Sequence, residues 1–162
     1  MGDAASATML AWGAYVAGEI ETFDGRRDLA EQHYVRAVDL ARTSGATFLV
    51  GVASVGLVAA RAAAGRVAEA LVGYREVVDY FARTGNWTHQ WTTLRNLADL
   101  LRRLGDEQAA ELLDVASDRF PDAPARDRAR SDAPLPSAVP VPGRDAVLEV
   151  ARRAIERNLT RA

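Results

Sequence analysis

The side chains best suited to chemistry gather on one face of a single expected helix, residues 87–104. At roughly 100° per residue, that face carries a set of polar and charged groups: His89, Thr92, Arg95, Asn96 and Asp99. Arginine is suited to bidentate capture of an anion, so His89, Arg95 and Asn96 are the members of this face that fit a peptide carboxylate or another small anion. We therefore predict these five residues as a partner-binding site, although the same pattern is typical of the solvated face of an amphipathic helix.

Catalytic and metal chemistry is not predicted from these residues. The two histidines, His33 and His89, lie far apart in the sequence and lack partners at ligand spacing. The chain has 0 cysteines, and its 20 cationic residues are all arginines, so thiolate and lysine chemistry are excluded. We expect no catalytic residue, no cofactor and no metal. An enzyme would need an acid–base pair that only folding brings together.

Composition also narrows the partners. The formal net charge of −2 leaves no broad cationic surface, so direct nucleic-acid binding is not expected. The most apolar run, residues 46–60, is shorter than the roughly 20 residues that a membrane span needs. The first residues do not resemble a signal peptide, so the sequence predicts a cytoplasmic protein, and its heavy use of Ala, Arg and Gly points to a bacterial genome.

The glycines reveal an internal repeat. Gly25, Gly65 and Gly105 define a 40-residue period, and Gly45 and Gly85 lie halfway between them. Glycine at such regular spacing is typical of helix ends, where it takes the left-handed conformation. The same 40-residue shift also aligns identical residues: Arg26 with Arg66, Ala30 with Ala70, Tyr34 with Tyr74, Val38 with Val78, and Asp39 with Asp79.

Between the glycines, apolar residues recur at helical spacing, and no stretch alternates with period two. The pattern predicts an all-α fold of antiparallel hairpins without a sheet. The two polar residues at the edge of the apolar arc in residues 87–104, Gln90 and Thr93, are expected to make hydrogen bonds between helices. The expected helices span residues 5–23, 27–43, 47–64, 67–83, 87–104 and 107–119.

The C-terminal part has a different composition. All 6 prolines fall between Pro121 and Pro142, so residues 121–144 are predicted to be a Pro-rich linker. Residues 145–160 follow as an amphipathic helix that Asp145 can cap. The apolar face of this helix needs burial, either against the end of its own array or against another chain.

The spacing Leu57-Val58…Ala70…Tyr74…Val77 resembles the small and aromatic positions of tetratricopeptide repeats. The 40-residue period is longer than the usual period of about 34, and no proline closes each repeat. Such long repeats resemble those near the C-terminus of large bacterial transcriptional regulators that carry a signal-transduction ATPase, and residues 84–98 look especially similar to them. The resemblance implies that residues 4–120 form three hairpins stacked as a right-handed superhelix.

The function implied is a non-catalytic protein-interaction or sensor module, acting as the C-terminal regulatory arm of such a regulator. Its partner would be a protein, a peptide or a neighbouring domain of the longer regulator. The alternative is a homo-oligomerisation element, such as a homodimer, that uses the tethered C-terminal helix.

Overall fold

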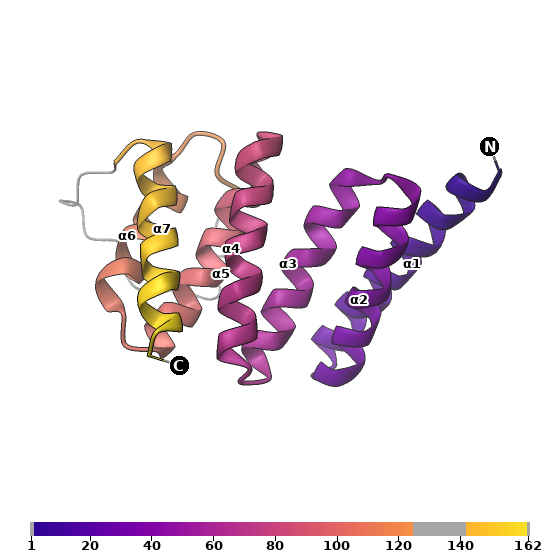
Figure 1. Ribbon diagram of the computed structural model, residues 1–162, viewed down its shortest axis with the longest axis horizontal. Coiled ribbons are helices and arrows are strands. Elements are labelled where there is room, and N and C mark those ends of the chain that lie inside the picture. The colour runs from indigo at the N-terminus through magenta and orange to yellow at the C-terminus, as the bar shows by residue number, and fades with distance from the viewer. Residues whose placement is uncertain (1, 125–141, 162) are drawn as a thin grey trace. The chain divides into compact units, whose positions relative to one another are not determined.

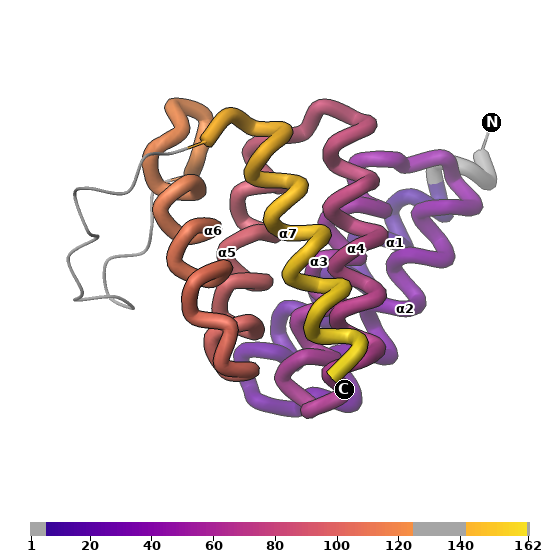
Figure 2. Tube along the Cα trace, turned by 60° about the vertical axis from the view of Figure 1, so that its left-hand side comes forward, coloured from indigo at the N-terminus to yellow at the C-terminus, as the bar shows by residue number. Residues whose placement is uncertain are grey.

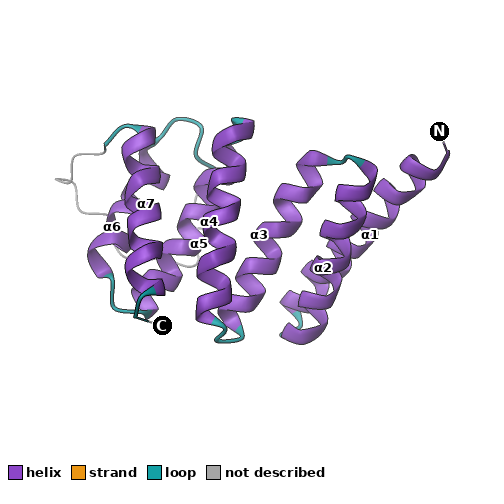
Figure 3. Cartoon of the chain, viewed as in Figure 1, coloured by secondary structure: helices purple, strands orange, loops and turns teal. Residues whose placement is uncertain are grey.

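A computed structural model describes residues 2–124 and 142–161, and within these ranges every regular element is a helix (Figure 3). The all-α prediction is therefore confirmed for the described residues. The helices are α1 (Gly2–Phe23), α2 (Arg27–Ser44), α3 (Thr47–Ala63), α4 (Val67–Thr84), α5 (Trp87–Arg103), α6 (Glu107–Arg119) and α7 (Arg144–Leu159).

The helix boundaries predicted from the sequence agree with α1 to α6 to within three residues. The last helix begins one residue earlier than predicted, at Arg144. The prediction that Asp145 caps it is wrong, because the N-cap is Gly143 and Asp145 lies in the first turn. There its carboxylate still lies near the positive end of the helix dipole. Most of the predicted linker, residues 125–141, lies outside the described residues.

A glycine in the left-handed conformation follows each of the helices α1 to α5. The five glycines of the 40-residue pattern have φ between 71° and 81°. After α2, the Gly45 N–H donates to the Arg42 carbonyl, and the Ala46 N–H donates to the Ala41 carbonyl at 2.9 Å. The same pair of bonds follows α1, α3 and α5. These bonds satisfy the last carbonyls of each helix and turn the chain sharply, which sets both helix length and hairpin geometry.

The chain forms two compact units, Met1–Val77 (unit 1) and Val78–Ala162 (unit 2). Unit 1 contains α1, α2, α3 and the first part of α4. In unit 1, α1 and α2 form an antiparallel hairpin, and α3 packs beside α2 (Figures 1 and 2). Small side chains fill much of the core between them, among them Ala11, Ala14, Ala37, Ala41 and Ala53.

Tyr34 occupies the centre of unit 1. A Cβ added to Gly18 of α1 would lie 2.7 Å from the Tyr34 ring, and one added to Gly56 of α3 would lie 2.5 Å from it. Both glycines are therefore required by close approach. The Tyr34 hydroxyl donates to Glu19 Oε1 at 2.6 Å and lies 3.0 Å from Thr22 Oγ1. One buried aromatic side chain thus joins three helices.

Unit 2 contains the end of α4 together with α5, α6 and α7. Arg144 at the start of α7 donates to Asp122, which follows α6. Arg157 near the end of α7 donates to Asp106, which precedes α6. The helix α7 therefore runs antiparallel to α6. Its apolar face is buried within the unit, and its fully or almost fully buried residues are Val147, Leu148, Ala151, Ala154 and Ile155.

A helix that crosses a bilayer must be both long and continuously apolar. Within the described ranges, none of the helices combines these two properties.

The glycine positions yield a testable contrast within unit 1. Gly65→Ala should lower the free energy of unfolding by about 1–2 kcal/mol, because φ of 79° is strained for alanine. Gly13→Ala should raise it by about 0.5–1 kcal/mol, because Gly13 lies inside α1 and alanine favours helix. Among the described residues, nothing lies within 4 Å of the added Cβ at either position. Urea denaturation measures both variants, and equal effects would contradict the assignment of Gly65 as a required helix end.

Candidate functional site

The outer face of α5 carries three of the five residues predicted to bind a partner. Thr92 and Asp99 are exposed, and Asn96 is half-buried. The Thr92 hydroxyl lies 3.4 Å from the Thr88 carbonyl oxygen one turn earlier, and Asp99 accepts from Arg102 at 3.1 Å. The spacing of four and three residues places Thr92, Asn96 and Asp99 along one line of the helix.

Arg95 is engaged inside the protein instead. Its guanidinium donates to the Ser117 carbonyl at 2.5 Å and to Asp118 at 3.0 Å, both at the end of α6. The side chain is only 16% exposed, and its Nε is buried without a hydrogen-bond partner among the described residues. Arg95 therefore links α5 to α6, and its guanidinium is not presented to an incoming carboxylate.

His89 and Arg95 lie on opposite sides of the line formed by Thr92, Asn96 and Asp99 on α5. The ring centre of His89 is 5.9 Å from that of Phe81 in α4, and its Nδ1 lies 2.9 Å from Asn86 Oδ1. Burial lowers the pKa of the imidazole below its ordinary value of 6.5. One repeat earlier, Leu49 packs in one cluster with Ala41. Phe81 and His89 stand 40 residues after Ala41 and Leu49, and their rings are in contact, so His89 fills a packing position.

The two polar residues at the edge of the apolar arc behave differently from each other. Gln90 donates from Nε2 to the Val78 carbonyl of α4 at 2.9 Å, which confirms a bond between helices. Its Oε1 is buried and has no hydrogen-bond partner within the described ranges. Thr93 donates to the His89 carbonyl of its own helix at 2.8 Å, so the prediction of a bond between helices is wrong there. A hydroxyl on a short side chain reaches the carbonyl one turn back more easily than a neighbouring helix.

The arrangement on α5 can recognise amide and cationic groups rather than a carboxylate. Asn96 both donates and accepts through its amide, and Thr92 does so through its hydroxyl. Asp99 supplies one exposed negative charge, which Arg102 partly offsets. This combination suits the backbone of an extended peptide that carries a basic side chain.

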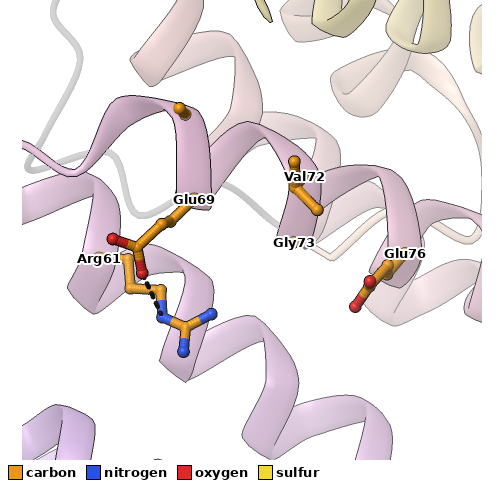
Figure 4. A pocket seen from close by; sticks show the side chains of 6 residues that line it. Arg61, Glu69, Val72, Gly73 and Glu76 are labelled. Atoms are coloured by element: carbon orange, nitrogen blue, oxygen red, sulfur yellow. Dashed lines mark ion pairs between the residues drawn. The ribbon is translucent and has the colours of Figure 1, made fainter.

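A hollow in unit 1 was not predicted from the sequence. Its volume is about 340 Å³, and it is lined by Arg61 of α3 and by Ala68, Glu69, Val72, Gly73 and Glu76 of α4 (Figure 4). Arg61 lies 3.0 Å from Glu31 and 3.9 Å from Glu69. The sequence did contain one signal for this hollow: Val72 is an apolar residue between two glutamates on the polar face of α4. The structure leaves it exposed. Because Arg61 already pairs with carboxylates, the hollow offers no uncommitted cation.

A metal site needs several ligating side chains that converge on one point. The part of the chain that the structure describes contains no group of three or more His, Cys, Asp or Glu side chains placed to hold a metal ion.

Comparison with protein-family models, with curated proteins and with solved structures found no match to this chain.

The contrasting roles of Arg95 and Asp99 can be measured. Arg95→Ala should destabilise unit 2 by about 2 kcal/mol, because it leaves the nearly buried Asp118 and the Ser117 carbonyl without this donor. Asp99→Ala should change stability by less than about 0.5 kcal/mol, because Asp99 is exposed. Chemical denaturation tests the pair. A small effect of Arg95→Ala would show that Arg95 is available to a partner.

The packing role of His89 predicts a pH dependence. Since the folded state holds the imidazole pKa below its unfolded value, the folded state binds fewer protons, and stability falls as the pH drops through about 6.5. His89→Leu places the residue of the preceding repeat at this position and should remove that part of the pH dependence. Urea midpoints at about pH 7.5 and pH 5.5 measure the effect. An unchanged pH dependence in the variant would contradict it.

Proposed function

We propose that this chain is a non-catalytic helical-repeat module of the tetratricopeptide-like type that binds a protein or peptide. Its hairpins stack as a right-handed superhelix. It serves as the C-terminal regulatory arm of a multidomain bacterial transcriptional regulator, and it acts in the cytoplasm.

One observation carries the repeat part of this proposal. Ala41 and Leu49 share one buried cluster, and the rings of Phe81 and His89, which lie 40 residues later at both positions, are 5.9 Å apart. In each case a left-handed glycine, Gly45 or Gly85, lies between the two residues. Packing that recurs with the sequence period supports hairpins that stack by translation, as repeat proteins do.

The partner-binding part rests on the outer face of α5. Thr92, Asn96 and Asp99 offer hydrogen-bond donors, acceptors and one negative charge along a rigid helix. A partner that contacts this face would favour one packing arrangement of the repeats against neighbouring domains, and so transmit a signal mechanically. No bond is made or broken in this mechanism.

The alternative, a homo-oligomerisation element built on the C-terminal helix, gains no support. The apolar face of α7 is buried within its own unit. Both ends of α7 are also tied by ion pairs, Arg144 to Asp122 and Arg157 to Asp106. To present this face to a second chain, α7 would have to detach from the rest of unit 2 and break these two ion pairs.

Selection from a phage-displayed peptide library tests the proposed partner face. Selected peptides should bind the chain, and the triple variant Thr92→Ala/Asn96→Ala/Asp99→Ala should weaken their binding at least about tenfold, because these side chains supply the polar contacts. The matched control replaces three exposed residues elsewhere in unit 2: Glu111→Ala/Arg153→Ala/Glu156→Ala. This control should bind as the wild type does.

Fluorescence anisotropy of the labelled peptides gives the affinities. The proposal fails if no selected peptide distinguishes the two triple variants, or if the selected peptides bind both as tightly as they bind the wild type.

A further inference from the structure

The helix α1 is apolar on two opposite faces. One face, with Ala11, Ala14 and Gly18, is buried in unit 1. The other face carries an exposed line of large apolar side chains, which we call the outer stripe: Met9, Trp12, Val16, Ile20 and Phe23. These five side chains are between 39% and 92% exposed. Their spacing of three, four, four and three residues keeps them on one side of the helix. A soluble helix normally places polar residues there.

The 40-residue register shows what lies at these positions in the next hairpin. Met9, Trp12, Val16 and Ile20 correspond to four residues of α3: Leu49, Val52, Gly56 and Ala60. Leu49 and Val52 share a buried cluster with Ala41 of α2, and Ala60 shares one with Ala30 and Tyr34. Gly56 faces the Tyr34 ring directly. In α3, therefore, this face packs against the second helix of the preceding hairpin.

We propose that the outer stripe of α1 is a docking surface for the second helix of a further helical hairpin, which stacks on α1 as α2 stacks on α3. This hairpin precedes α1 in the longer regulator, so the inference rests on the repeat arrangement of the proposed function. It does not use the partner face on α5.

The size of the stripe favours this occupant over a second copy of the chain. A stable interface between separate proteins takes about 20–30 residues from each side, far more than one line of five. Within one polypeptide, the tether raises the effective concentration of the docking helix, so a single helix face is sufficient.

The side chains of the stripe also define the docking helix. Val16 has a branched side chain where α3 has Gly56, so a tyrosine like Tyr34 would collide with it. Ile20 and Trp12 are likewise larger than Ala60 and Val52. The docking helix must therefore be apolar and must carry a small residue at the position that corresponds to Tyr34.

A fusion of the chain with its own hairpin tests the proposal. In the fusion, a copy of residues 5–46 is joined directly to residue 7 of the chain. Since residue 7 corresponds to residue 47, the added hairpin lies one full repeat before α1. In the first fusion the copy carries Tyr34→Ala, so that an alanine would face Val16 of α1. In the second fusion the copy keeps Tyr34, so that a tyrosine would face Val16 of α1. In the third fusion the copy keeps Tyr34 and α1 carries Val16→Gly, so that the tyrosine would face a glycine.

Hydrogen exchange of the α1 amides is compared between each fusion and its unextended parent. Docking should slow exchange in residues 7–23 by at least about tenfold in the first and third fusions, and much less in the second. All three fusions lengthen the chain equally, so reduced fraying of the α1 terminus cannot produce this pattern. Val16→Asp in the first fusion should abolish the protection.

Two results would overturn the inference. One is equal exchange in α1 for all three fusions. The other is a dimer of the unextended chain, seen by analytical ultracentrifugation, that Val16→Asp dissociates, because the stripe would then serve a second copy. Neither result affects the peptide selection on α5. The docking inference can therefore fail while the proposed partner face on α5 stands.

Discussion

The structure depends on glycine taking a left-handed conformation at every half-period of the repeat. At Gly25, Gly45, Gly65 and Gly105 two backbone hydrogen bonds close the helix, and at Gly85 its own N–H donates to the Phe81 carbonyl; a side chain would be strained at any of these points. The helices α1 to α5 consequently have similar lengths, and residues one period apart lie at corresponding places along their helices. This register places Leu49 in one buried cluster with Ala41 of the preceding helix, and His89 beside Phe81 of the preceding helix.

Once the register is fixed, the residues at equivalent positions can diverge. The position of Gly56 admits the Tyr34 ring in α3, whereas the same position holds Val16 in α1 and Asn96 in α5. The position of Leu49 is Met9 in α1 and His89 in α5. One structural position thus serves as a core contact, an exposed apolar surface or a polar surface. Side-chain size and polarity therefore differ among helices at one and the same position of the sequence repeat.

Arginine provides the connections within unit 2 that apolar packing leaves incomplete. Arg95 reaches Ser117 and Asp118, Arg144 reaches Asp122, and Arg152 donates twice to Asp79. Arg144 also lies over the rings of Trp87 and Phe120, at 4.7 and 5.5 Å. A planar guanidinium can donate in several directions and stack on aromatic faces, which a lysine ammonium does not combine. The contacts of Arg144 and Arg152 hold the first turn and the middle of α7 against the rest of the unit.

The positions of α1 to α6 can be predicted from the amino-acid sequence alone, because helix ends and apolar spacing are local properties, set here by glycines such as Gly25 and Gly45. The sequence also located the polar face of α5. Which members of that face are exposed depends on how the helices pack, since the acceptors of Arg95 lie on a different helix, α6, and the ring that His89 contacts lies on α4. The exposure of the outer stripe was hidden in the same way. A helical wheel shows which residues share a face, but only packed neighbours decide whether that face is buried.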